Sequence, residues 1–299
     1  MTNPGNRTHA QGPGVCRYNL FMNSQSPPLI IGFASDLMSI TRIEQAAHGA
    51  GYQMHWIESQ AQIAPGVPEH PTPQRTEHLH GPGYYLLEEI TRLQPALLIL
   101  DLGNQQVPWR EWIGMLRSVA STRRIPLICF GSHMDVESFQ AAKKAGAQAV
   151  LARSAFFGDL PGVLQKYAQV PDWEALAEFC KQPLPPIARK GLELFNAGEY
   201  FEAHEELEAA WMEEPSPGRA LYQGVLQVAV AYLQIERGNR DGAIKLFLRS
   251  RQWLAHLPDT CQGVDVKQLK QDAGEVELAL KEEGLEAAME RFKPVKYSE

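Results

Sequence analysis

Two groups of side chains in this sequence have the types and the spacing that chemistry requires. The first lies in the stretch HEELE, where His204 and Glu208 stand four residues apart and Glu205 follows the histidine. On a helix, residues four apart share a face, so His204 and Glu208 could chelate a divalent metal ion, with Glu205 beside them. Such a site would suit a metal-dependent hydrolase, and no other cofactor is expected. The second histidine of an HExxH motif is missing, which excludes a zincin.

The stretch that follows offers polar partners to this histidine. The helical period places His204 and Trp211 on one stripe that faces the core, and Gln223 and Gln227 share one face of the next, mostly apolar helix. Buried amides need hydrogen-bond partners. The cluster is therefore a satisfied buried polar network, a ligand or metal pocket, or a catalytic site. Asn239 is predicted to cap the helix after it.

The second group lies at the end of a predicted strand, where Asp101 closes the run PALLIL. In an open parallel sheet, ligands gather at the carboxyl ends of the strands, which is where this aspartate is expected. Five alternations of short apolar runs with helical stretches predict a parallel sheet that is covered on both faces. The strands are expected at 29–33, 52–57, 96–100, 126–130 and 147–151, and the helices at about 38–49, 84–93, 109–121, 134–145 and 156–168.

This pattern, with Gly51-Tyr52 before the second strand, resembles the receiver domain of two-component response regulators over about residues 28–168. The resemblance implies a flavodoxin-like fold with a five-stranded parallel sheet and a phosphoryl acceptor at Asp101. It also implies a pair of acids after the first strand, which hold a divalent cation beside the acceptor. Those positions fall on Ala34 and Ser35, so the acid pair is absent.

Three further residues could replace the missing receiver parts. Asp36 lies just beyond the acid-pair positions, Ser132 stands one place after the expected switch hydroxyl, and Arg153 takes the place of the family's lysine. In one interpretation, these three residues keep Asp101 phosphorylatable. In the other, the domain is a pseudo-receiver that forms dimers or docks a partner, because phosphoryl transfer depends on the electrostatic stabilisation that the metal ligands provide.

Beyond residue 186 the pattern is helical throughout, which predicts an all-α bundle. Helices are expected at 187–197, 199–213, 219–236, 241–256, 265–283 and 285–292, with Gly198, Gly238 and Gly284 at helix ends. The stretches FNAGEYFEAHEELEAAW and YQGVLQVAVAYLQIERGNRDGAIKLF resemble the uncharacterised family called domain of unknown function 309, over about residues 187–258. The resemblance implies a small all-helical fold and brings no established activity.

Composition limits the classes of function. A net charge of −7 and the absence of a basic block argue against nucleic-acid binding. No apolar stretch approaches the length of a membrane span, and four widely spaced cysteines without a CxxC pair indicate reduced thiols in the cytoplasm. Residues 1–27 are expected to be a disordered leader, 28–168 the receiver-like domain, 169–186 a linker and 187–299 the helical domain.

The function expected from these features is a non-enzymatic signalling or scaffold role. The pseudo-receiver would bind a protein partner or a second copy of the chain, and the helical domain would bind a partner or a small ligand. Two alternatives remain open: the metal-dependent hydrolase at His204, Glu205 and Glu208, and a response regulator phosphorylated at Asp101.

Overall fold

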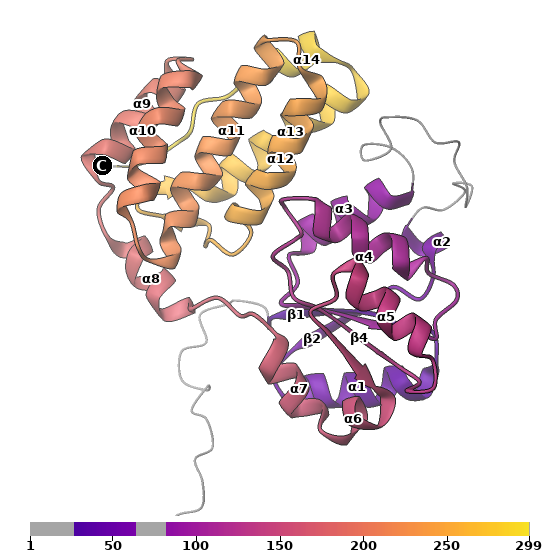
Figure 1. The fold of residues 1–299 in the computed structure, drawn as a ribbon. Coiled ribbons are helices and arrows are strands. Elements are labelled where there is room, and N and C mark those ends of the chain that lie inside the picture. Colours follow the sequence, from indigo (N-terminus) through magenta and orange to yellow (C-terminus); the bar gives the residue numbers. More distant parts are fainter. Residues whose placement is uncertain (1–26, 64–81, 299) are drawn as a thin grey trace, which may run out of the picture.

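The computed structural model describes residues 27–63 and 82–298, which form two domains (Figure 1). Residues 1–26, which make up nearly all of the predicted leader, lie outside the described residues. Within the described ranges, no helix combines the length and the apolar character that crossing a bilayer would require.

The first domain is built on a parallel sheet of five strands in the order β2-β1-β3-β4-β5. Every residue of the two central strands β3 and β4 is buried. Strands that are covered on both faces read as continuous apolar runs, which is the pattern seen in LLILD and LICFG. The strands are β1 (Leu29–Phe33), β2 (Gln53–Trp56), β3 (Leu97–Asp101), β4 (Leu127–Gly131) and β5 (Ala149–Ala152).

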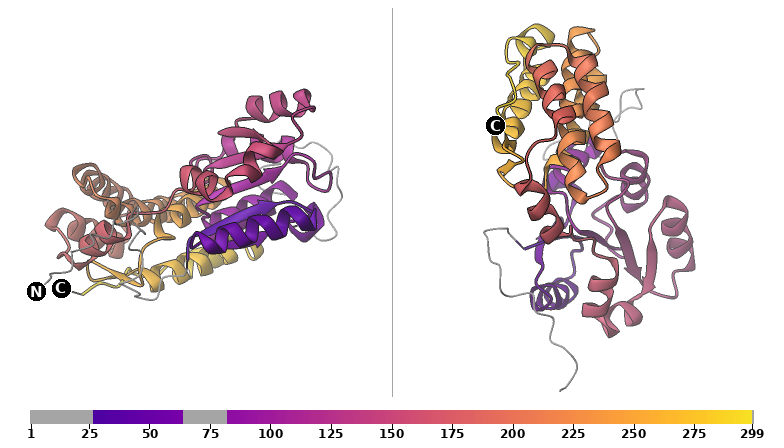
Figure 2. Two further views of the ribbon diagram at one scale, coloured as in Figure 1. Left: turned by 90° about the horizontal axis from the view of Figure 1, so that it is seen from below. Right: turned by 90° about the vertical axis from the view of Figure 1, so that its left-hand side faces the viewer.

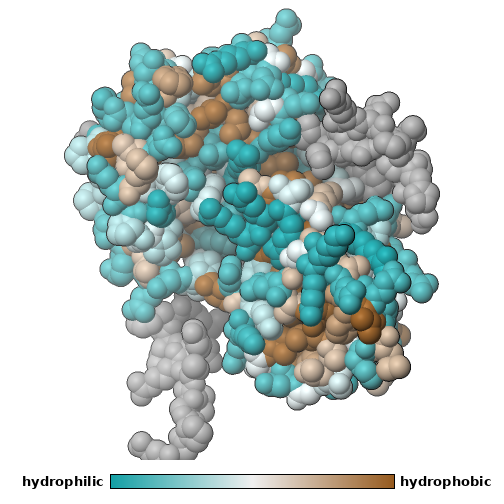
Figure 3. All heavy atoms as spheres, viewed as in Figure 1, coloured by the Kyte–Doolittle hydropathy of each residue, from teal (hydrophilic) through white to brown (hydrophobic). Residues whose placement is uncertain are grey.

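Helices cover both faces of this sheet (Figure 1). On one face, Phe130 of β4 stacks on Phe156 at a centroid distance of 4.4 Å, and on the other Phe33 meets Trp112 edge-on at 5.6 Å. The first face carries α1 (Leu37–Gly49), α6 (Arg153–Gly158) and α7 (Leu160–Tyr167); the second carries α3 (Pro82–Leu93), α4 (Trp109–Ser118) and α5 (Val136–Ala145), while α2 (Gln60–Ile63) is a single turn. In the space-filling view, hydrophobic residues form patches on the surface of both domains (Figure 3).

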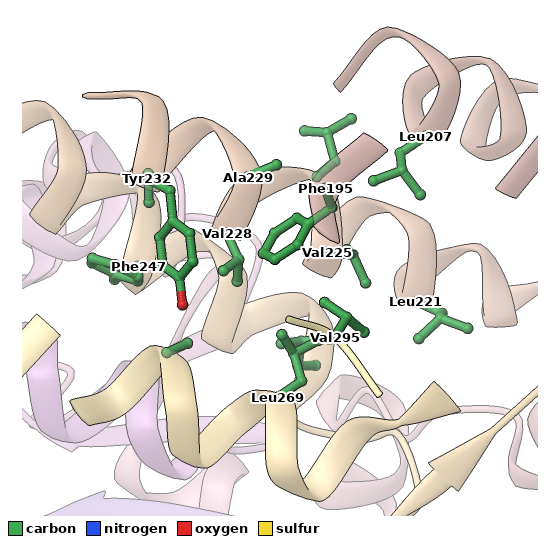
Figure 4. Close-up of a cluster of buried hydrophobic side chains, with 14 of the residues drawn as sticks. Phe195, Leu207, Leu221, Val225, Val228, Ala229, Tyr232, Phe247, Leu269 and Val295 are labelled. Carbon is green, nitrogen blue, oxygen red and sulfur yellow. The ribbon is translucent and has the colours of Figure 1, made fainter. Parts of the chain in front are cut away.

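The second domain is a bundle of antiparallel helices, seen from two further sides in Figure 2. Its centre is α11, which is apolar nearly all round; Tyr232 of this helix and Phe195 and Phe247 of its neighbours fill the core (Figure 4). The elements are α8 (Trp173–Lys181), α9 (Pro186–Asn196), α10 (Tyr200–Glu213), α11 (Ala220–Glu236), α12 (Arg240–Leu254), the hairpin β6 (Thr260–Cys261) and β7 (Val264–Asp265), α13 (Val266–Glu282) and α14 (Leu285–Met289).

The predicted helix-end signals are found where the sequence placed them. Gly198, Gly238 and Gly284 have φ values of 83°, 74° and 105°, the conformation in which glycine avoids a steric penalty. Asn239 caps α12 by accepting a hydrogen bond at 3.0 Å from the N–H of Gly242, as predicted.

Two expectations about residues 169–186 and the cysteines need correction. The segment expected to be a linker contains α8, whose Leu176 and Phe179 are buried in the core of the helical domain. The prediction of reduced thiols is wrong for two cysteines: Cys180 of α8 and Cys261 of β6 form a disulfide. Residues 81 apart in the sequence gave no CxxC signal, because the fold alone brings them together. Cys129 is a buried free thiol, and burial raises its pKa to about 12.

The helical domain packs against α3 of the first domain. Tyr84 of α3 belongs to the buried cluster of the helical domain, and Lys281 of α13 forms an ion pair with Glu88 of α3. Lys281 also pairs with the buried Glu277 at 2.7 Å and lies 5.2 Å from the centre of the Tyr84 ring. Burial opposes the charge of Lys281, but its two carboxylate partners outweigh burial and raise its pKa above the usual value.

Candidate functional site

The carboxyl edge of the sheet holds an ion pair at the predicted acceptor position. Asp101 ends β3 and is only 3% exposed. Arg153 begins α6 directly after β5, and its Nη2 donates to both carboxylate oxygens of Asp101, at 3.0 and 2.8 Å. The arginine reaches across β4, where its guanidinium carbon lies 5.1 Å from the centre of the Phe130 ring. Asp101 and Arg153, which the sequence placed at one edge of the sheet, are therefore in direct contact.

The same guanidinium continues to the start of α1. Its Nη1 donates to the Ser39 hydroxyl at 2.9 Å, and that hydroxyl donates to Oδ2 of Asp36 at 2.6 Å. Asp36 also caps α1, since the same oxygen accepts from the Ser39 N–H at 3.0 Å. These hydrogen bonds from Ser39 lower the pKa of Asp36. Arg153 lies 3.9 Å from this carboxylate, so one arginine connects two acids.

The positions of the expected acid pair hold no metal ligands. Ala34 is buried, and the hydroxyl of Ser35 donates to Oδ1 of Asn104 at 3.3 Å. Across residues 27–63 and 82–298, no three His, Cys, Asp or Glu side chains are placed so that they could hold a metal ion. Asp101 also accepts the N–H of Gly103 at 2.9 Å. A backbone N–H and the guanidinium of Arg153 therefore donate to the carboxylate of Asp101.

Ser132 stands apart from this network. Its side chain is exposed, and its hydroxyl accepts a hydrogen bond from the N–H of Met134 at 3.3 Å instead of facing Asp101. Sequence reasoning missed Ser39, which joins Arg153 to Asp36. The spacing Asp36-x-x-Ser39 at a helix start could have revealed it, because an N-cap acid accepts from the residue three places on.

The cluster in the helical domain does not form the predicted polar network. His204 is half-buried and stacks on the ring of Phe201 at a centroid distance of 6.5 Å, while Glu205 is exposed and Glu208 is half-buried. Within the part of the chain that the structure describes, these three residues make no hydrogen bond or ion pair. The reason is the phase of α10: its buried stripe consists of Tyr200, Ala203, Leu207 and Ala210, which leaves His204 at the side.

The two glutamines of α11 are left without the expected partners. The Oε1 atoms of Gln223 and Gln227 are buried and accept no hydrogen bond. Trp211 lies under the guanidinium of Arg219, 4.6 Å from ring centre to Cζ, and makes no hydrogen bond to either glutamine. Neither the satisfied network nor the metal alternative at His204 and Glu208 matches this arrangement.

Comparisons with known proteins agree with the two folds. Residues 188–246 match the family model of a domain of unknown function, DUF309. The sheet order β2-β1-β3-β4-β5 with helices on both faces is the flavodoxin-like fold of receiver domains. No curated protein matches the sequence.

Three solved receiver structures illustrate the likeness of the first domain. The receiver domain of a sensor histidine kinase from Pseudomonas aeruginosa, which has a magnesium ion in its active-site cleft, is 15% identical, with 47% of this chain and 97% of that chain covered at a TM-score of 0.36. The chemotaxis response regulator CheY4 of Vibrio cholerae is 14% identical, with 47% and 98% covered at 0.35. A response regulator from Thermotoga maritima is 12% identical, with 47% and 96% covered at 0.32.

Proposed function

We propose that this protein is a non-enzymatic signalling or scaffold protein whose first domain is a pseudo-receiver. The observation that carries the proposal is that Nη2 of Arg153 donates hydrogen bonds to both carboxylate oxygens of Asp101. An acceptor carboxylate must offer a free oxygen to an incoming phosphoryl group, and a divalent cation must lie beside it to neutralise the developing charge. Here the guanidinium holds both oxygens.

Electrostatics supports the same proposal. A divalent cation placed beside Asp101 would stand next to the positive charge of the Arg153 guanidinium. The remaining acid of the edge, Asp36, already accepts two hydrogen bonds from Ser39 with one of its oxygens. The guanidinium of Arg153 thus occupies the place beside Asp101 that a metal ion would need, and a metal ion would have to displace it.

The surroundings of the ion pair favour association. Because β3 lies between β1 and β4, the segments that follow those two strands flank Asp101. Both segments expose large apolar side chains: Leu37 and Met38 on one side, and Met134 and Val136 on the other, with exposures of 58–78%. Exposed apolar groups gathered at one place mark interaction sites. We call these four residues the edge patch and propose that it binds a protein partner or a second copy of the chain.

Acetyl phosphate with magnesium tests the pseudo-receiver proposal. We expect intact-mass spectrometry of the treated protein to show no added phosphoryl group. The comparison is a variant that combines Ala34→Asp, Ser35→Asp and Arg153→Lys. This variant restores the acid pair and removes the guanidinium that pairs with Asp101. A stable phosphoryl adduct on Asp101 of the wild type would overturn the proposal whatever the variant does.

A matched pair of substitutions tests the edge patch. Met134→Glu places a charge in the patch, whereas Met212→Glu changes a similarly exposed methionine of the helical domain, 68% exposed against 78% for Met134. If a second copy is the partner, we expect light scattering to show association that Met134→Glu weakens and Met212→Glu leaves intact. A monomeric wild type would leave a different protein as the partner, and equal losses in both variants would contradict a role for the patch.

A cytoplasmic location belongs to the same proposal. Cytosolic thiols are normally kept reduced, so in this location the disulfide between Cys180 and Cys261 would have to resist reduction. Cys261 is fully buried, and exchange requires that a thiolate reach a disulfide sulfur. Burial therefore shields the sulfur of Cys261, whereas Cys180 is only half-buried.

A further inference from the structure

A cleft of about 340 Å³ lies between the two domains, where the end of α3 meets α12 and α13. Arg92 and Gln94 line it from the first domain, and Arg251, His256 and Lys270 line it from the second. We propose that this cleft binds a small, multiply charged anion of the phosphate type. The site is separate from the Asp101–Arg153 pair and does not depend on its role.

The charge balance of the cleft is positive although the protein as a whole is acidic. Arg92, Arg251 and Lys270 contribute three cations, and Glu277 is the one carboxylate in the lining. Glu277 is 1% exposed and is already shared between Arg251 and Lys281. Arg92 pairs with Glu89, which lies outside this cleft, and remains 62% exposed. An anion in the cleft would meet more positive than negative charge.

Lys270 carries the strongest argument because its ammonium is partly buried and no carboxylate contacts it in the described part of the chain. Its ammonium donates to the carbonyl oxygen of Leu257 at 3.1 Å, and no carboxylate lies within 4.0 Å of it in the described part of the chain. Burial lowers the pKa of this lysine, and burial together with Lys270 lowers the pKa of the neighbouring His256. Removing an ammonium partly from water without a carboxylate in contact costs free energy, and a bound anion would offset that cost.

Gly274 lies beside the cleft, within the 17 residues of α13, where glycine is less favourable than alanine. A Cβ atom at this position would have no heavy atom within 4 Å, so packing does not require glycine here. The absent side chain leaves free space beside the cationic residues, and any larger residue would extend into it.

The chemistry of the lining selects the class of ligand. Arginine offers a planar fork that matches phosphate, and lysine binds phosphate as a point charge. Neutral His256 adds a hydrogen-bond donor without further charge. The volume falls within the usual range of small-molecule sites, which begins at about 300 Å³. A ligand at this place would contact both domains, since Arg92 and Lys270 belong to different ones.

Calorimetry with inorganic pyrophosphate at constant ionic strength tests the proposal on the full chain. We expect the wild type to bind pyrophosphate more tightly than inorganic phosphate. Lys270→Gln should weaken binding at least about tenfold, because it removes a charge-assisted hydrogen bond to the anion. Gly274→Glu should abolish it, since the new carboxylate would occupy the place of the anion.

Two glycine variants separate binding from folding. Gly274→Ala should keep the affinity of the wild type and raise its stability, because alanine favours the helix and fits the free space. Gly114→Glu introduces the same charge at a helical glycine of α4 that also has open space around it, and it should bind as the wild type does. A wild type without measurable affinity at millimolar pyrophosphate would overturn the proposal, as would equal affinities of Gly274→Glu and Gly114→Glu.

Discussion

Replacing Arg153 by methionine should destabilise the first domain through the carboxylate that is left behind. The side chain of Asp101 is 4% exposed and that of Arg153 is 43% exposed. Methionine keeps an apolar stem over Phe130 but removes both hydrogen bonds to Asp101 and the bond to Ser39. The change therefore isolates the polar part of the interaction.

The size of the effect follows from these exposures. Breaking a fully buried ion pair costs about 3–5 kcal/mol, whereas an exposed pair contributes about 0–1 kcal/mol. Because water reaches one partner here, and Gly103 still donates to Asp101, we expect Arg153→Met to lower the free energy of unfolding by about 2 kcal/mol. Asp101→Asn combined with Arg153→Met should cost less than the sum of the single changes, because neither partner is then left charged and alone.

Arg42 provides the matched control. Its guanidinium lies 4.4 Å over the ring of Phe157 and donates to a backbone carbonyl, but it pairs with no carboxylate in the described ranges. Arg42→Met should therefore cost about 0.5 kcal/mol or less. Urea unfolding at low salt gives the free energies, and hydrogen exchange of the peptide that contains β3 assigns the loss to this domain. Equal losses for Arg153→Met and Arg42→Met would refute the interpretation that the buried carboxylate depends on its arginine.

Three further predictions concern the helical domain. Gln227→Leu should leave the stability in thermal unfolding unchanged or raise it, because the buried Oε1 of this glutamine has no hydrogen-bond partner. Gln262→Leu should instead lower the free energy of unfolding by about 1–3 kcal/mol, because Gln262 accepts a hydrogen bond from the buried hydroxyl of Tyr222. Cys180→Ser should cost up to about 4.5 kcal/mol in urea unfolding without reductant and nothing with it, since the lost bond closes a loop of 81 residues. Lowering the pH from about 8 to about 6 should destabilise the wild type more than His256→Gln, because burial lowers the pKa of this histidine and the unfolded chain binds the proton first.

The five strands of the sheet and most of the helices could be predicted because their signals are local, whereas α2 and the hairpin of β6 and β7 were not predicted. Short apolar runs predicted the five strands, and three glycines with positive φ values stand at helix ends of the bundle, where they were expected. Asp101 could be placed at the carboxyl edge because a strand must end where its apolar run ends. These conclusions need only the neighbours in the sequence and the rules of parallel sheets.

The geometry of the sites could not be predicted, because it depends on contacts between distant residues. Arg153 is separated from Asp101 by 52 residues, and only the order of the strands brings β5 near β3. The helical period predicted that His204 faces the core. In the structure, α10 packs on α9 and α11 through the stripe that contains Ala203 and Leu207, which leaves His204 at the side. The disulfide could not be predicted for the same reason, since its two cysteines belong to elements that meet only in the folded bundle.

The two ends of the sheet have different surroundings, and this difference separates the two proposals in space. Pro95 and Pro126, which precede β3 and β4, line a cleft of about 230 Å³ with Trp253 and His256 of the helical domain. The amino edge of the sheet therefore faces the second domain and the anion cleft. The carboxyl edge carries the Asp101–Arg153 pair and the edge patch on the other side. The edge patch and the anion cleft therefore share no residue.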